Sequence, residues 1–133
     1  MLHDGLGNPV RLEHATSLPA FNDFVEGFIA CEARVAHVLD IAAQDGSTSV
    51  QAACAALHMF AEAPGAPALA RPYVERALAA APRATERERR FAAAVAAWVE
   101  GDVARAIALH EEQAKLFPRD LASLKLGQYH LFN

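Results

Sequence analysis

Cysteine is scarce in this chain, whose 133 residues include only Cys31 and Cys54. Two cysteines without a paired spacing build neither the disulfide framework of a small secreted domain nor a zinc site. The N-terminus also lacks the basic and apolar regions of a signal peptide. We therefore expect both thiols to be reduced and buried, in a cytoplasmic protein.

Long hydrophobic runs and an excess of basic residues are also missing. The most apolar stretch, residues 50–61, is too short to span a bilayer, and His58 interrupts it. The formal net charge is −4, and the densest basic cluster is interleaved with glutamates, which indicates a solvated helix start. That cluster comprises Arg83, Arg87, Arg89 and Arg90, with Glu86 and Glu88 between them. We expect neither a membrane nor a nucleic acid as a partner.

Glycine and proline are few, with seven of each, and most fall between stretches of helical periodicity. Hydrophobic residues make up 53% of the chain and charged residues 21%, which is typical of a globular protein and not of a disordered one. Much of the apolar content is alanine, the strongest helix former. These features predict an all-α fold in a single domain.

The first part of the chain divides into a leader and one or two helices. Residues 1–15 have few apolar anchors and predict a flexible leader to a helical domain that covers residues 16–133. Ser17 is a plausible N-cap. Residues 18–44 form either one long helix or two, and the apolar stripe changes phase at Cys31–Ala33, which favours a split there.

Breakers and caps divide the rest of the chain into five helical segments. Their expected positions are about 48–61, about 68–81, a helix opened by Thr85-x-x-Glu88 and closed by Gly101, about 102–117, and about 120–132. The first of these is apolar nearly all round, so we expect it to be buried on several sides. Thr85 and Glu88 match a capping box, and Asp102 and Asp120 stand where N-caps are expected.

The C-terminal third has the pattern of a helix, a tight turn, a second helix and a helix end. Four residues indicate this pattern: Trp98, Gly101, Ala106 and Pro118. Glycine permits the backbone conformation of a tight turn, a small alanine lets two antiparallel helices approach, and proline ends the second helix. These offsets match the second half of a tetratricopeptide repeat, whose period is about 34 residues. Further along, Leu126-Gly127 resembles the paired Leu-Gly in the first helix of a further repeat.

Three segments of the second half resemble one family in particular. The chain is similar to the amino-terminal part of the tetratricopeptide repeat protein 38 family in the segments Thr85–Arg89, Trp98–Asp102 and Pro118–Lys125, and also at Pro64 and Pro72-Tyr73. The resemblance runs from about Phe21 onward. It implies a right-handed superhelix of antiparallel helix pairs, a TPR-like α-solenoid of about six to seven helices. Members of that family are several times longer and of poorly defined function, so the resemblance implies a truncated N-terminal portion of a longer solenoid.

Six histidines raise the question of metal or acid–base chemistry. His3, Asp4 and His14 could form a surface site, although solvated leader residues are the preferred interpretation. Cys54 and His58 are one helical turn apart, a spacing that can chelate a metal. The surrounding helix is apolar and no further ligands have a matching pattern, which favours a buried packing pair.

His110 lies one turn after Ala106, where we expect a packed histidine. The sequence contains no nucleophile elbow, Walker loop, zincin motif or dinucleotide fingerprint. We therefore expect no catalytic, cofactor-binding or metal-binding residue in this chain. The competing hypothesis is that the chain is the amino-terminal half-shell of a His-dependent enzyme or metal protein whose site lies outside it.

The leading hypothesis is a protein–protein interaction or scaffold module that binds a protein or peptide. Helix phase selects five polar residues as candidates for a binding groove: Asn22, Glu26, Arg90, Glu100 and Gln128. A solenoid cut before its cap exposes apolar surface, and on the last helix that surface comprises Leu121, Leu124, Leu131 and Phe132. Burial of one such side chain contributes roughly 1.5–3 kcal/mol. We therefore expect a homo-oligomer that forms through this helix.

Overall fold

The computed structural model of the chain describes residues 1–133. The chain is mostly helical, which confirms the predicted all-α class. The long helices are α1 (Leu18–Ala30), α2 (Thr48–Phe60), α3 (Ala66–Ala80), α4 (Glu86–Val99), α5 (Val103–Leu116) and α6 (Leu121–Phe132). Short 3₁₀ segments are η1 (Ala15–Ser17), η2 (Ala33–Ile41) and η3 (Ala81–Arg83), and the antiparallel strands β1 (Leu2–His3) and β2 (Pro9–Val10) precede them all. No helix is long and apolar enough to cross a membrane.

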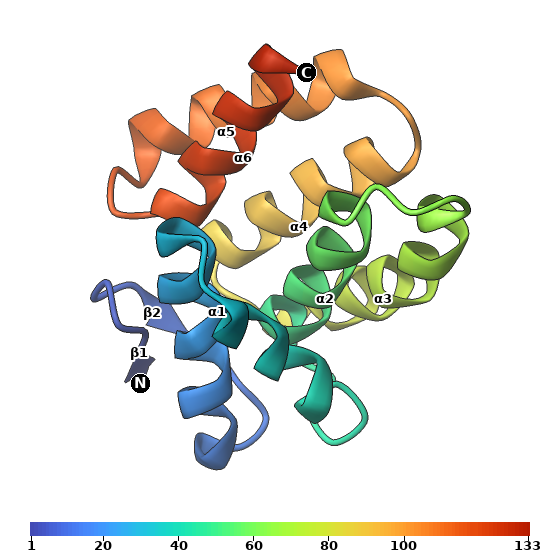
Figure 1. The fold of residues 1–133 in the computed structure, drawn as a ribbon. Coiled ribbons are helices and arrows are strands. Elements are labelled where there is room, and N and C mark those ends of the chain that lie inside the picture. The colour runs from blue at the N-terminus through green and yellow to red at the C-terminus, as the bar shows by residue number, and fades with distance from the viewer.

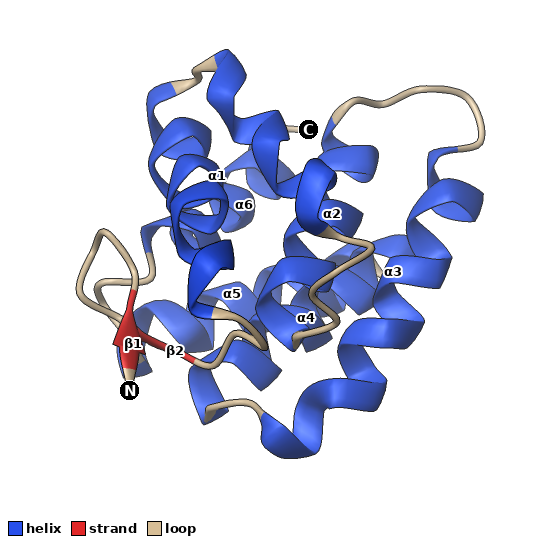
Figure 2. Cartoon of the chain, turned by 90° about the horizontal axis from the view of Figure 1, so that it is seen from below, coloured by secondary structure: helices blue, strands red, loops and turns tan.

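Most helices pack against their neighbours in sequence. α2 packs against α3, α4 against α5, and α5 against α6. α4 also contacts both α2 and α3 and crosses the middle of the molecule, while α5 and α6 lie together at one end (Figure 1). α1 contacts η2 and also α6, so an early and a late segment of the chain lie together. The strand pair lies at the edge of the helical body (Figure 2).

The predicted split of residues 18–44 is confirmed. α1 ends at Cys31, whose φ of 59° is left-handed, and the following segment η2 is a 3₁₀ helix and not an α-helix. Side chains three residues apart eclipse each other in a 3₁₀ helix. Val35, Val38 and Ile41 have that spacing, and all three pack into the core. Leu39 and Ala42 also pack against the core.

Residues 1–15 are not a loose leader in the structure, which corrects the expectation from the sequence. The Asp4 carboxylate accepts the backbone N–H groups of Leu6 and Asn8 and closes a turn, and the β1–β2 pair follows from it. Val10 is 1% exposed. The Asn8 amide donates to the carbonyl of Arg119 at 2.9 Å, which ties the hairpin to the start of α6. The segment has few apolar residues, and polar contacts with a distant part of the chain hold it in place.

The helix ends expected from the sequence are confirmed where local signals are strong. Thr85 and Glu88 form the reciprocal capping box. Gly101 adopts a φ of 86°, and the Asp102 carboxylate caps α5. Asp120 caps α6 in the same way, by accepting the N–H of Ser123. Ser17 stands at the N-cap of α1 but its side chain makes no cap bond.

The core is centred on α2, which is buried nearly all round as predicted. A chain of aromatic contacts links this helix to its neighbours. The ring centroids of Phe28 on α1 and Phe60 on α2 lie 5.3 Å apart, and those of Phe60 and Tyr129 on α6 lie 4.9 Å apart. Tyr129 in turn lies 5.6 Å from Trp98 on α4. These contacts hold the C-terminal helix against the first two α-helices.

Candidate functional site

A groove of about 310 Å³ runs between α5 and α6. Eight residues line it: His110, Glu111, Ala114 and Lys115 on α5, and Leu124, Gly127, Gln128 and Leu131 on α6. Gly127 lies where α6 packs tightly against His110 of α5. A Cβ atom on Gly127 would lie 3.0 Å from the Cβ of His110, closer than ordinary van der Waals contact. A methyl group at this position would therefore crowd the contact between the two helices.

We expect Gly127→Ala to lower the free energy of unfolding by about 1 kcal/mol. Alanine favours a helix over glycine by about 1 kcal/mol, but overpacking a tight contact costs about 1–3 kcal/mol. The atom that the added methyl group would meet is the Cβ of His110, which cannot move without α5. Urea unfolding measures the change. The control is Gln128→Ala at the next, exposed position, with an expected change within about 0.5 kcal/mol, and a stabilised Gly127→Ala variant would contradict the tight packing.

The walls of the groove are largely apolar on α6. Leu124 and Leu131, two of the four residues predicted for self-association, line the groove and are 39% and 58% exposed. Leu121 and Phe132 are also exposed, but neither lines the groove. Apolar side chains with this much exposure in and beside a concave surface are typical of a protein-binding site.

The α5 wall carries one charge of each sign. Glu111 and Lys115 are both exposed and both line the groove, and neither takes part in an ion pair within the chain. Glu112, the neighbour of Glu111, faces away and pairs with Arg90 on α4 at 3.1 Å. The groove thus offers an unpaired carboxylate and an unpaired ammonium, one helical turn apart, to whatever occupies it.

A buried pair of histidines underlies the groove. His110 is 2% exposed, and its Nδ1 lies 2.7 Å from the hydroxyl of Ser123, which confirms the prediction of a packed histidine. Its ring lies 5.8 Å from that of His130, and neither Nε2 atom has a hydrogen-bond partner. Burial, with a smaller contribution from His130, lowers the pKa of His110 to about 4. Burial also lowers the pKa of His130, so both rings are neutral at pH 7.

A buried ion pair fixes α6 to the rest of the fold. The Arg87 guanidinium donates to the Asp120 carboxylate at 3.1 Å and to the carbonyl of Pro9 at 3.0 Å. The Gln113 amide donates to the same carboxylate and to the carbonyl of Arg87. This network joins the hairpin, α4, α5 and α6, and so it positions the groove.

Two residues of this region correct the expectation of a solvated helix start. Arg87 is 8% exposed and Glu88 only 1%. The Glu88 carboxylate accepts from the hydroxyl of Ser49 at 2.5 Å and from the backbone N–H groups of Thr85 and Arg11. The charges alternate in sequence as they do on a solvated face, but their partners lie on other elements, which the sequence pattern does not reveal.

The five polar residues predicted to bind a partner do not share one surface. Only Gln128 lies in the groove. Asn22 accepts the N–H of Gly5, Glu26 pairs with Arg34 of η2, and Arg90 pairs with Glu86 and Glu112. Glu100 is exposed at the far end of α4, opposite the end that carries Arg90. Three of the five are therefore engaged within the chain.

The candidate metal ligands do not converge. No group of three His, Cys, Asp or Glu side chains is placed to hold a metal ion. Asp4 turns inward to its own turn, away from a shared site with His3 and His14. His58 is half-buried and stacks on Tyr73 with centroids 5.3 Å apart, whereas Cys54 is fully buried.

The two cysteines have different environments. Cys54 is fully buried, and burial raises the pKa of its thiol to about 12. Cys31 is exposed, which corrects the prediction that both are buried. Its left-handed backbone ends α1 at the surface, and its sulfur lies 3.0 Å from the ammonium of Lys125.

No family model, curated protein or solved structure matches the chain.

Proposed function

We propose that this chain is a helical protein-interaction module and that the occupant of its α5–α6 groove is a second copy of the chain. The observation that carries the proposal is the exposure of Leu124 and Leu131 in the groove between two well-packed helices. Each half-exposed leucine that an interface covers contributes about 1 kcal/mol. Because both copies contribute both leucines, a symmetric contact doubles this gain.

The charges in the groove support a second copy as the occupant. Glu111 and Lys115 lie one turn apart on α5 and are unpaired within the chain. A two-fold axis between two antiparallel copies of α5 places Glu111 of one copy opposite Lys115 of the other, and the reverse. The charges of α5 are thus complementary to those of a second copy, as an isologous interface requires.

The arrangement of the helices supports a TPR-like module. α4 and α5 are antiparallel partners joined by a tight turn at Gly101, and α6 packs against α5 and, through Tyr129 and His130, against Trp98 of α4. Ala106 on α5 is fully buried, and Gly127 on α6 packs tightly against His110 of α5. The contact of α6 with α1 and with the hairpin is additional to such a repeat pattern.

Light scattering after size exclusion tests the proposal. We expect the wild-type chain to have twice the chain mass, and the double variant Leu124→Glu/Leu131→Glu to be a folded monomer. The matched control is Leu69→Glu/Leu78→Glu on α3, which changes two leucines of similar exposure (53% and 44%) outside the groove and should remain a dimer. A wild-type monomer at the highest soluble concentration would refute self-association.

Charge reversal on α5 tests the symmetry of the contact. Glu111→Lys places like charges opposite each other and should weaken the dimer. Adding Lys115→Glu to the same chain restores two opposite pairs across the two-fold axis and should restore the dimer. Failure of the double reversal to restore it would exclude this pairing.

A further inference from the structure

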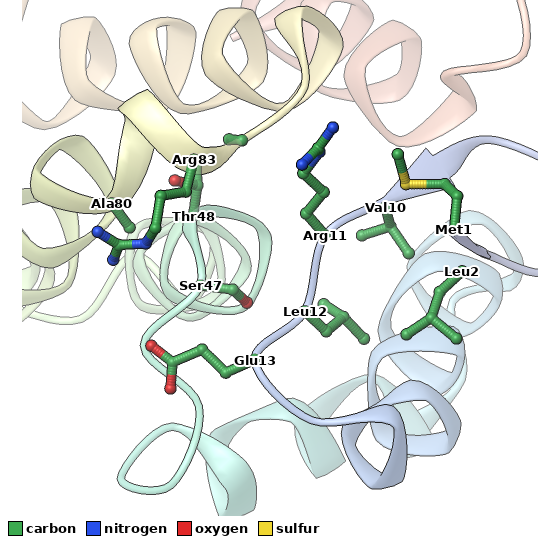
Figure 3. A pocket seen from close by; sticks show the side chains of 11 residues that line it. Met1, Leu2, Val10, Arg11, Leu12, Glu13, Ser47, Thr48, Ala80 and Arg83 are labelled. Carbon is green, nitrogen blue, oxygen red and sulfur yellow. The ribbon is translucent and has the colours of Figure 1, made fainter.

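A surface pocket of about 540 Å³ lies between the hairpin, the start of α2 and the end of α3 (Figure 3). Its polar side chains do not converge on one ligand. The guanidinium groups of Arg11 and Arg83 point away from Ser47 and from each other (Figure 3). The Glu13 carboxylate lies against Gly46, next to Ser47. This open pocket therefore indicates no particular ligand, in contrast to a cavity in the protein interior.

The interior cavity has a volume of about 20 Å³ and lies between the hairpin, α1, α2, α4 and the start of α6. All of its lining residues are buried except Leu6, which is half-buried. A water molecule needs about 10–15 Å³ of accessible space, so the cavity has room for one water molecule and for nothing much larger. Its polar wall consists of Asp4, Asn8, Ser49, Arg87 and Asp120, and its remaining residues are apolar.

One donor in the polar wall has no acceptor within the chain. Arg87 is 8% exposed, and its two terminal nitrogens donate to the Asp120 carboxylate and to the carbonyl of Pro9. Its third nitrogen, Nε, has no hydrogen-bond partner. Buried polar groups are normally hydrogen-bonded, and an unpaired one on a charged side chain is costly. Because Arg87 lines the cavity, an occupant of the cavity can supply the missing acceptor.

Other polar groups of the wall can accept further hydrogen bonds. The Asp4 carboxylate accepts the backbone N–H groups of Leu6 and Asn8 through Oδ1, and its Oδ2 accepts no hydrogen bond within the chain. The Ser49 hydroxyl donates to the Glu88 carboxylate and accepts none. A carboxylate offers about four lone-pair sites and a hydroxyl two. The occupant of the cavity should therefore accept one hydrogen bond and donate others.

These requirements select water among molecules of this size. An anion cannot donate to the Asp4 carboxylate, and the carboxylates of Asp4 and Asp120 repel it. A cation, ammonium included, cannot accept from Arg87 Nε, and the guanidinium repels it. Water accepts and donates at once, and a buried water molecule typically makes about three hydrogen bonds.

We propose that this cavity is the binding site of one internal water molecule, which accepts from Arg87 Nε and donates to Asp4 Oδ2 and Ser49 Oγ. The water joins the turn of the hairpin to α2 and α4. It thereby completes the polar network that fixes α6 through Asp120. The site is independent of the proposed dimer groove, with which it shares no lining residue.

A crystal structure of the full chain, at a resolution that shows ordered water, tests the site. We expect one density peak in the cavity, at hydrogen-bond distances from Arg87 Nε and Asp4 Oδ2 and not at the shorter distances of a coordinated metal cation. The peak should persist in crystals grown without ammonium salts, and crystals soaked in bromide should show no anomalous signal there. No peak in the cavity, a peak that requires ammonium, or a bromide signal would overturn the proposal.

NMR of two matched variants in solution tests the position of the water. In the wild-type chain, the Nε–H of Arg87 should give a nuclear Overhauser effect to water with the sign of a long-lived bound molecule. Ala122→Val adds two methyl groups to a residue of the cavity wall and should abolish this signal. Ala97→Val makes the same change at a buried alanine of α4 outside the cavity and should retain it. An equal signal in both variants would show that the water lies elsewhere, and the wild-type crystal identifies the occupant even if neither variant folds.

Discussion

Asp120→Ala is expected to lower the free energy of unfolding by about 4 kcal/mol, the largest effect of any single substitution considered. Asp120 is 5% exposed and is the only carboxylate that pairs with the buried guanidinium of Arg87. Removing one partner of a buried ion pair leaves an uncompensated charge, which costs about 3–5 kcal/mol. The Gln113 amide also loses an acceptor, and α6 loses its N-cap.

Asp102→Ala is a matched control for this prediction. Asp102 caps α5 as Asp120 caps α6, with a carboxylate that accepts the N–H of the third residue along, but Asp102 is exposed and has no ion pair. Loss of a cap alone costs about 1 kcal/mol. Urea unfolding of both variants therefore separates the cap from the ion pair, and equal losses would show that the ion pair contributes nothing.

A second substitution tests whether the unpaired charge of Arg87 causes the loss of stability. Arg87→Met in the Asp120→Ala background removes the unpaired charge and replaces it with an apolar side chain. Replacement of a whole buried ion pair by apolar groups is often neutral or stabilising. The double variant should therefore be more stable than Asp120→Ala alone, whereas a further loss would show that the Arg87 contact with the Pro9 carbonyl dominates.

The same network shows what the sequence predicts and what it does not. Caps at Thr85, Asp102 and Asp120 were predictable because each depends on residues three positions away. The partner of Arg87 lies 33 residues further along the chain, and no local sequence pattern predicts this contact. The alternating charges around Arg87 therefore predicted solvation, while long-range contacts bury the guanidinium.

The candidate site likewise contains residues that the sequence predicts and residues that it does not. Helix phase placed Leu124 and Leu131 on an exposed face, and both line the groove. It did not identify Glu111 and Lys115, because the direction in which α5 faces depends on how α4 and α6 pack on it. The cavity beside Arg87 depends on a hairpin within residues 1–15, and a segment with so few apolar residues has no periodicity from which to predict contacts.

Acid should destabilise the fold between pH 7 and pH 5, by about 2 kcal/mol from His110 alone. The pKa of His110 is about 4 in the folded chain and near 6.5 when the ring is exposed. The unfolded chain thus binds a proton at a pH at which the folded chain does not, so protonation favours unfolding. This contribution is absent well above pH 6.5, grows as the pH falls below 6.5, and reaches its limit near pH 4.

His110→Asn tests whether this residue causes the pH dependence. Asparagine retains a polar atom for the Ser123 hydroxyl but does not titrate. The variant should be less stable at pH 7, because it leaves a cavity, yet lose less stability than wild type between pH 7 and pH 5. His14→Asn, at an exposed position, should keep the wild-type dependence.

The pKa of His130 is lowered in the same direction, so part of the dependence should persist in His110→Asn and disappear when His130 is substituted too. Urea unfolding at pH 7, 6 and 5 measures each slope. An unchanged slope in the double variant would show that the acid sensitivity arises outside the histidine pair beneath the groove.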